Sequence, residues 1–295
     1  MLEYDSIAEI IDTANSRGIT ASRLVLEDQA AAMEKPESEL LERMAETLDV
    51  MRRSAAGGSS PYIKSTSGIT GGDGARMLGY ASGGSALGGR FCAKAIATAI
   101  AIAEYNASMG KIVAAPTAGS CGILPAGILT MIDERGIGER QALFGMLTAG
   151  AIGMVIASVA SISGAQGGCQ AECGSAAAMT AGALVELSGG TNDMIAHAIA
   201  ISLKNMLGLV CDPVAGLVEV PCIKRNAGGV MNAICAADMA LAGIRSVIPA
   251  DEVIGAMRDI GESLPASLRE TAKGGLAETP TGIMIRKKVF GYREE

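Results

Sequence analysis

Residues 141–171 contain no charged side chain, and this stretch limits what the chain can fold into. It is long enough to cross a bilayer, so it must be buried either in lipid or in a protein core. It is rich in small residues, no basic cluster follows it, and it ends in a loop of glycines and a cysteine. The backbone of such a loop would be unsatisfied in lipid. We therefore expect a buried core helix rather than a transmembrane helix, and no membrane partner.

The composition shows what such a core is made of. Apolar residues make up 49% of the chain, but there are only 3 Phe, 5 Tyr and no Trp, beside 39 Gly and 16 Met. Ala, Ile, Leu, Val and Met must therefore fill the core, with close backbone approaches at the glycines. The net charge is −7 without any Lys/Arg-rich run, which argues against a nucleic-acid partner. The first ten residues lack the basic region of a signal peptide, so we expect a reducing, cytoplasmic location.

Helical periodicity dominates, and no segment alternates with a period of two. Residues 2–56 predict helices, with Leu41, Met44 and Leu48 on one face, Pro36 at the first turn of the last helix, and the run at 57–61 ending it. We expect further helices at about 91–109, 138–161, 170–187, 192–207, 226–243 and 250–262, and a short strand at 111–115. Thr191 is a plausible N-cap. The fold class is mainly α, with an N-terminal helical region (1–56) continuous with a catalytic domain (57–295).

Two glycine-rich segments suggest anion binding. Residues 57–89 hold eleven glycines and interleave them with Lys64, Ser65, Ser67 and Asp73. The segment is either an ordinary surface loop or linker, or a loop wrapped around a small anion that its accessible amides bind. Residues 116–122 form a second loop, which enters an apolar helix. Hydroxyls and amides at a helix N-terminus make an anion site, although many tight turns have this composition.

Seven cysteines are present, an odd number that disfavours a secreted disulfide scaffold. Cys169 and Cys173 share one loop, and Cys211 and Cys222 follow 42 and 53 residues after Cys169. Zinc sites usually draw on closely spaced pairs. Thiols that converge from several loops fit an iron–sulfur cluster at least as well. Spacing alone leaves three possibilities: an iron–sulfur cluster, a zinc site or buried free cysteines.

Several long motifs in order resemble the α subunit of iron–sulfur L-serine dehydratases: KSTSGITGGD, NASMGKIVAAPTAGSCGILPA, GAQGGCQAECGSA and CDPVAGLVEVPCIKRNAGG. The resemblance runs from about Lys64 to Gly282. It implies a [4Fe–4S] cluster held by Cys169, Cys211 and Cys222, with one iron open to the substrate hydroxyl. Cys173 lies outside that trio, as a packing residue or a spare thiol.

The resemblance implies a cytoplasmic lyase of serine catabolism and gluconeogenesis, which dehydrates and deaminates L-serine to pyruvate and ammonia. The candidate substrate-binding residues are Ser65, Ser67, Gly68, Gly71, Asp73, Thr117, Ala118, Gly119, Ser120 and Asn226. Lys64 is the catalytic candidate, either as a base or as a partner for the substrate carboxylate. The alternative interpretation is that Lys64 is an ordinary exposed lysine in a loop. Asn226 either contacts substrate or caps a helix. His197, the single histidine, is interpreted as a packing residue.

Two departures from the family pattern bear on partners. Some single-chain relatives use a C-terminal cysteine as a ligand to the open iron, whereas this sequence ends VFGYREE. The Ser/His-rich loop of the family's β portion is also absent here, so we expect a separate β subunit. Three alternatives stay open: a desulfidase acting on L-cysteine with the same kind of cluster, a non-catalytic iron–sulfur or zinc sensor, and a membrane protein.

Overall fold

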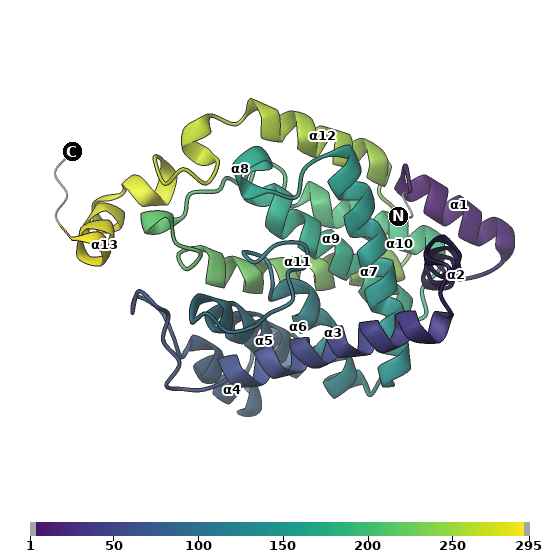
Figure 1. Cartoon of the computed structure of the whole chain (residues 1–295), viewed down its shortest axis with the longest axis horizontal. Helices are drawn as coiled ribbons and strands as arrows, with labels where there is room; N and C mark the ends of the chain where they lie inside the picture. Colours follow the sequence, from purple (N-terminus) through teal and green to yellow (C-terminus); the bar gives the residue numbers. More distant parts are fainter. Residues whose placement is uncertain (1–3, 292–295) are drawn as a thin grey trace.

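The computed structural model describes residues 4–291, and within them the chain forms α-helices and no β-strand, as expected for a mainly α protein. The helices are α1 (Ile7–Arg17), α2 (Ala21–Met33), α3 (Glu37–Gly58), α4 (Asp73–Ser82), α5 (Gly89–Ala107), α6 (Ile123–Arg135), α7 (Glu139–Val159), α8 (Gly164–Gly167), α9 (Ser175–Leu187), α10 (Asn192–Lys204), α11 (Cys222–Leu241), α12 (Ala250–Ser263) and α13 (Pro280–Phe290). A π-helix, Gln170–Gly174, leads into α9. In Figure 1, α13 projects from the body at the end opposite α1 and α2.

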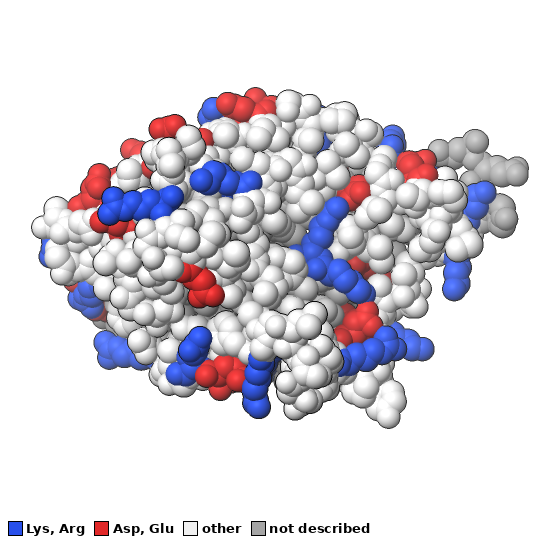
Figure 2. All heavy atoms as spheres, turned by 180° about the vertical axis from the view of Figure 1, so that it is seen from behind, with Lys and Arg blue, Asp and Glu red and all other residues white. Residues whose placement is uncertain are grey.

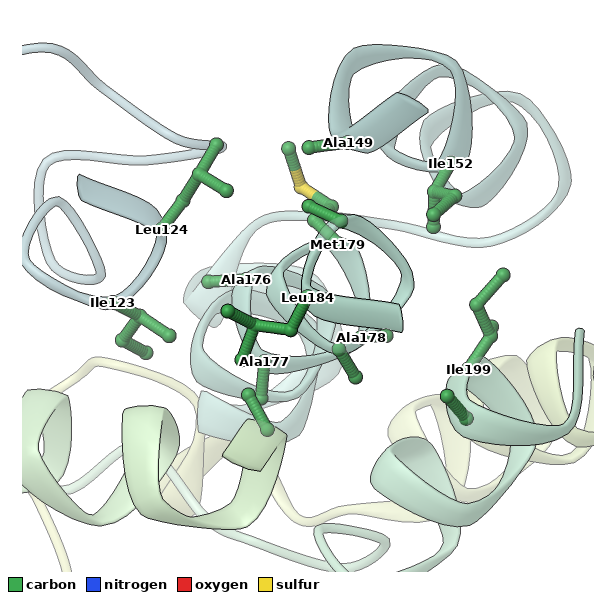
Figure 3. Close-up of a cluster of buried hydrophobic side chains, with 14 of the residues drawn as sticks. Ile123, Leu124, Ala149, Ile152, Ala176, Ala177, Ala178, Met179, Leu184 and Ile199 are labelled. Carbon is green, nitrogen blue, oxygen red and sulfur yellow. The ribbon is translucent and has the colours of Figure 1, made fainter. Parts of the chain in front are cut away.

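The centre of the molecule is α9, which is buried along almost its whole length. Helices α6, α7, α10 and α11 pack around it. Figure 3 shows its alanines and Met179 among Ile123, Ile152 and Ile199, which come from three of those neighbours. The side chains are small, so the helices approach closely. A Cβ on Gly182 would lie 2.4 Å from Ile152 Cδ1, so this position admits no side chain without a shift.

The uncharged stretch found in the sequence forms most of α7. Among the described residues, α7 is the one helix long and apolar enough to cross a membrane, and 67% of its most apolar window is buried inside the protein. It packs against α9 on one side and α2 on another. Most of its apolar surface is therefore covered by the protein's own helices, as expected for a core helix.

The N-terminal helices share the hydrophobic core with the rest of the chain. Tyr4, Ile7, Leu24 and Leu48 belong to the same buried cluster as the side chains of α9. The long helix α3 runs across α5, α6 and α7 (Figure 1). A Cβ on Gly58, its last residue, would lie 1.8 Å from the carbonyl oxygen of Ala101. This glycine lets the end of α3 rest directly on the backbone of α5.

Charges of both signs cover the surface. On the face in Figure 2, acidic and basic side chains are interspersed, and neither sign gathers into an extended patch. Several of them form ion pairs, such as Arg23 with Glu37 at 2.7 Å and Lys94 with Asp133 at 2.8 Å. These exposed pairs each contribute little to stability.

Some sequence predictions of local structure are wrong. Residues 111–115 form an irregular segment instead of a strand, because no strand lies beside them to complete a ladder. The single β-bridge in the described part of the chain joins Cys211 to Arg269. The glycine-rich segment 57–89 contains the helix α4, and α13 lies beyond the last helix expected. Helix α11 begins at Cys222, four residues earlier than expected. Thr191 caps α10 as predicted, since its hydroxyl accepts a hydrogen bond from Met194 N.

The start of α4 depends on a buried carboxylate. Glu104 on α5 is 1% exposed, and its two carboxylate oxygens accept hydrogen bonds from Asp73 N at 3.0 Å and Gly74 N at 3.1 Å. These amides belong to the first turn of α4 and have no partner inside the helix. A negative charge at this end also complements the helix dipole.

We expect Glu104→Ala to lower the free energy of unfolding by about 2–4 kcal/mol, because two buried amides lose a charged acceptor. Urea denaturation followed by circular dichroism would measure the change. Glu42→Ala, on the exposed face of α3, serves as the control and should change stability by less than about 0.5 kcal/mol. An equal effect of the two substitutions would contradict the capping role of Glu104.

Candidate active site

Four buried cysteines come together from three segments of the chain. Cys169 immediately precedes the π-helix and Cys173 lies within it, and their Sγ atoms are 3.4 Å apart. Cys211 lies in the segment after α10, and Cys222 is the first residue of α11. All four residues are buried, with exposed fractions from 1% for Cys173 to 8% for Cys222, and each thiol lies close enough to its neighbours to affect their protonation.

The turn before Cys169 needs a glycine. Gly168 has a φ of +75°, and a Cβ there would lie 2.9 Å from the carbonyl oxygen of Leu209. The buried side chain of Gln170 then ties the π-helix to its surroundings, accepting from Gly208 N and donating to Met257 O, both at 2.9 Å. Single π-turns within helices are frequent at functional sites. The segment that carries Cys169 is thus fixed against the chain that leads to Cys211.

Backbone hydrogen bonds hold Cys211 on both sides. Its N–H donates to Leu268 O and its carbonyl accepts from Glu270 N, both at 2.8 Å. The next residue, Asp212, is buried, forms an ion pair with Arg225 at 2.8 Å and accepts a hydrogen bond from Leu276 N. The Arg225 guanidinium also donates to Val210 O. This network connects the Cys211 segment to the start of α11, where Cys222 lies.

The four thiols differ in how readily they ionise. The contact with Cys173 lowers the pKa of Cys169, and the nearby positive charge of Arg225 lowers it further. The same contact, together with burial, raises the pKa of Cys173 well above its usual range. Burial raises the pKa of Cys211 and raises that of Cys222 to about 12. Cys169 is therefore the thiol of the group that ionises most readily.

The donor set fits an iron–sulfur cluster better than a single metal ion. Within residues 4–291, no three Cys, His, Asp or Glu side chains are arranged closely enough to hold one ion. Zinc with sulfur ligands at about 2.3 Å would need such an arrangement. A cluster of several irons is larger and separates its thiolates more widely, and soft sulfur ligands from separate segments suit it. Cys169, Cys211 and Cys222 carry sulfur atoms of this kind on three separate segments.

The loop at residues 116–122 lies against the π-helix. Thr117 Oγ1 donates to Glu172 Oε1 at 2.8 Å, and the Thr117 and Ser120 hydroxyls are 3.1 Å apart. A Cβ on Gly119 would lie 3.1 Å from Glu172 Oε1. Ala118 is exposed, and its carbonyl accepts a hydrogen bond from Asn106. This loop therefore lies beside the π-helix that follows Cys169.

The loop at residues 64–74 lies beside Cys222. Glu219, three residues before Cys222, is buried and accepts a hydrogen bond from Thr70 Oγ1 at 2.8 Å. Lys224, two residues after Cys222, places its Nζ atom 2.5 Å from Asp73 Oδ2. Gly68 and Gly71 both have positive φ, and a Cβ on Gly71 would lie 2.1 Å from the carbonyl oxygen of Ile63. Because Lys224 pairs with it, the carboxylate of Asp73 already has a partner within the protein.

Ser65 and Ser67 form a small hydroxyl pair in this loop, with their Oγ atoms 3.2 Å apart. Ser65 Oγ accepts from Thr70 N at 3.3 Å, and Ser67 Oγ accepts from Ile69 N at 3.1 Å. The two hydroxyls have two protons, and their mutual hydrogen bond uses one. The other proton remains available to a bound anion.

Asn226 connects the two halves of the site. It is 1% exposed, and its Oδ1 accepts from Gly122 N at 2.8 Å, at the start of α6. Its Nδ2 donates to Gly119 O at 2.8 Å and to Cys222 O at 2.9 Å. The alternative that Asn226 caps α11 is wrong, because it lies in the second turn of that helix and Pro221 occupies the N-cap. The side chain instead fixes the 116–122 loop to the helix that carries Cys222.

Neither Lys64 nor His197 makes a hydrogen bond to the thiols in the described part of the chain. Lys64 is exposed on the 64–74 loop, and its ammonium group makes no hydrogen bond or ion pair in the described part of the chain. His197 on α10 is half-buried and lines a surface hollow of about 340 Å³ with Asp193 and Arg245. None of the four clustered cysteines lines that hollow.

Glu172 is the site residue that sequence reasoning missed. It lies in the π-helix three residues after Cys169, and burial raises the pKa of its carboxyl group. A Cβ on Gly164 would lie 2.8 Å from Glu172 Oε2 and 3.0 Å from Cys211 Sγ, so the carboxylate and this thiol face the same glycine. The sequence did contain a signal: Glu172 is the single charged residue between Arg140 and Glu186.

The geometry defines an all-helical protein with a buried thiol site enclosed by two glycine-rich loops. The chain belongs to the serine dehydratase alpha chain family, which matches residues 16–277. It is 48% identical to the probable L-serine dehydratase, alpha chain, of Bacillus subtilis, over 98% of this chain and 96% of the relative. It is 47% identical to the L-serine dehydratase, alpha chain, of Peptoniphilus asaccharolyticus, over 95% of this chain and 96% of that relative.

A longer relative has a different chain organisation. The L-serine dehydratase of Streptomyces coelicolor is 38% identical over 91% of this chain, but the match covers 59% of the relative. The Bacillus and Peptoniphilus relatives are named as alpha chains, so they belong to enzymes of more than one subunit. The Streptomyces protein therefore contains additional sequence, in the same polypeptide, that lies outside the region it shares with this chain.

Proposed function

We propose that this chain is the alpha subunit of an L-serine dehydratase, which converts L-serine to pyruvate and ammonia in the cytoplasm. The observation that carries the proposal is the convergence of three buried thiols and two glycine-rich loops, in a chain that matches alpha chains over nearly their full length. The reaction removes a proton from Cα and hydroxide from Cβ. Aminoacrylate is released, and it tautomerises and hydrolyses to pyruvate and ammonia.

Cys169, Cys211 and Cys222 are the residues that would hold a [4Fe–4S] cluster. When bound, the cluster supplies a Lewis-acidic iron that stabilises the departing hydroxide without redox chemistry. The protein's part is to fix the three thiolates, and the Asp212–Arg225 pair and the Gln170 hydrogen bonds do so from both sides. Cys173 adjoins Cys169 and affects its protonation.

The two loops bind and orient the substrate carboxylate in this proposal. The free proton of the Ser65–Ser67 pair is one donor for an anion, and the backbone amides of the two loops that have no partner among the described residues are others. Thr117 and Ser120 hold the site together instead, since the Thr117 proton is given to Glu172. Asn226 acts by positioning the 116–122 loop against α11.

A base must take the Cα proton, and neither Lys64 nor His197 meets the requirements for it. An efficient base has a pKa near neutrality and reaches the substrate. His197 lies on a different surface, and Lys64 is exposed and unconstrained. We infer that a separate beta chain completes the site with the base.

The proposal is tested with the anaerobically prepared chain, alone and mixed with a candidate beta chain. We expect the isolated chain to have less than about 1% of the L-serine turnover of the complex, because loss of a general base costs about 10²–10⁴-fold. Pyruvate release measures the activity. Full turnover by the isolated chain would contradict the need for a partner and favour Lys64 as the base. A parallel assay with L-cysteine separates dehydration from desulfidation.

A further inference from the structure

Glu172 is a partly buried carboxylate without a cation. Its Oε1 accepts a hydrogen bond from Thr117, whereas Oε2 has no hydrogen-bond partner in the described part of the chain. Lysine and arginine do not pair with it within residues 4–291. A carboxylate taken out of water without a counter-charge is costly, so its retention here requires an explanation. The raised pKa of Glu172, caused first by burial, reflects this cost.

Arg225, the positive side chain that acts on Glu172 through space, is committed elsewhere. The Arg225 guanidinium pairs with Asp212 and donates to Val210 O. The Lys224 ammonium pairs with Asp73. Arg225 attracts Glu172 through space without touching it, and the Glu270 carboxylate repels it. Residues 4–291 therefore hold no lysine or arginine that pairs with Glu172.

The position of Glu172 brings it within reach of a small ligand in the site. Its Oε2 and Cys211 Sγ lie within about 3 Å of one point beside Gly164, and its Oε1 faces Gly119 in the 116–122 loop. L-Serine carries its carboxylate, ammonium and β-hydroxyl groups on three consecutive carbons. A molecule of this size, placed between the cysteines and the loop amides, presents its ammonium group within a few ångströms of the other two groups.

We propose that Glu172 binds the α-ammonium group of the substrate and thereby makes the site specific for amino acids. This inference rests on the proposed function and adds the residue that recognises the third substrate group. Thr117 holds one oxygen of the carboxylate, so the other is oriented toward the ligand. Glu172 is a substrate-binding residue in this view, and the proton on Cα goes to a different group.

The test compares L-serine with 3-hydroxypropanoate, which keeps the carboxylate and hydroxyl groups but lacks the ammonium group. Both are measured on the cluster-containing complex with the beta chain, as KM and kcat for L-serine and as the inhibition constant for 3-hydroxypropanoate. In Glu172→Gln we expect KM for L-serine to rise about 30-fold or more, because a buried charge pair is lost. The inhibition constant for 3-hydroxypropanoate should change less than about threefold.

Matched variants separate recognition from a general loss of charge. Glu42→Gln removes a carboxylate on the exposed face of α3, away from the thiols, so both constants should stay within about twofold of wild type. Glu172→Asp keeps the charge on a shorter side chain and should give an intermediate KM. If Glu172→Gln has no measurable turnover, calorimetric binding of the two compounds to the complex gives the same comparison.

The outcomes are distinct. Equal weakening of both compounds would overturn the inference, because it would show a disturbed pocket instead of a lost ammonium partner. A fall in kcat with unchanged KM would also overturn it, and would make Glu172 the proton acceptor. Loss of iron from Glu172→Gln would assign it a structural role. Failure of the wild-type complex to act on L-serine would instead refute the proposed function, whatever the variant does.

Discussion

Replacing Cys211 with serine is expected to leave the anaerobically purified protein without iron or sulfide, and its complex with the beta chain without L-serine turnover. A serine hydroxyl at neutral pH does not replace a thiolate as a ligand of a soft iron–sulfur cluster. The Cys211 backbone is held by hydrogen bonds to Leu268 and Glu270 that do not involve the sulfur. The fold should therefore survive, and the loss can be attributed to the missing ligand.

Iron and sulfide per chain measure this result, and wild type should contain about four of each. Cys169→Ser and Cys222→Ser should behave as Cys211→Ser does. The controls are Cys92→Ser and Cys235→Ser, in accessible parts of α5 and α11, together with Cys121→Ser in the 116–122 loop. These three should keep the cluster. Full iron content in Cys211→Ser would show that Cys211 is not a ligand.

Cys173 is a sharper case, because its Sγ lies 3.4 Å from that of Cys169. Spacing alone could not separate these two thiols, since both lie in one short segment. The family pattern puts Cys169 among the ligands and Cys173 outside them. Iron content in Cys173→Ser would therefore decide between a neighbour that tunes Cys169 and a fourth ligand.

The sequence predicted the helices whose signals are local. The uncharged stretch predicted a buried helix, and α7 is that helix; Thr191 predicted the start of α10. The strand expected at 111–115 was wrong because the apolar run around Ile112 and Val113 carries no information about a partner strand. Helix α4 was hidden because its first turn is capped by Glu104, a residue about thirty positions away.

The same distinction applies to the site. The motifs indicated which segments meet, but not how individual side chains are used once they meet. The Asp73 carboxylate pairs with Lys224, and the Asn226 amide is fully used by Gly119, Gly122 and Cys222. Except for Cys222 and Asn226, the two members of each pair are distant in the sequence, so only the tertiary structure shows that they interact. For Glu172, its isolation among uncharged residues was visible, but its contact with Thr117 was not.

Replacing the glycine at position 119 is expected to disturb the 116–122 loop where it faces Glu172. Its carbonyl accepts a hydrogen bond from Asn226 Nδ2, and a Cβ would lie 3.1 Å and 3.3 Å from the two oxygens of Glu172. The γ-methyl groups of valine need more room in the same direction. They must displace either the Glu172 carboxylate or the 116–122 loop, and a shift of about 1 Å in a positioning group can cost 10²-fold in rate.

We therefore expect Gly119→Val to lower kcat/KM for L-serine about 100-fold while iron and sulfide content stay at the wild-type level, because no cysteine ligand is touched. Gly119→Ala adds the Cβ alone, at a distance that neighbours accommodate by small shifts, and should lose less. Gly138→Val is the matched control, since a Cβ there meets no atom within 4 Å and φ is −69°. Wild-type kcat/KM in Gly119→Val would show that substrate does not approach this loop, and loss of iron would show that the loop supports the thiols instead of the substrate.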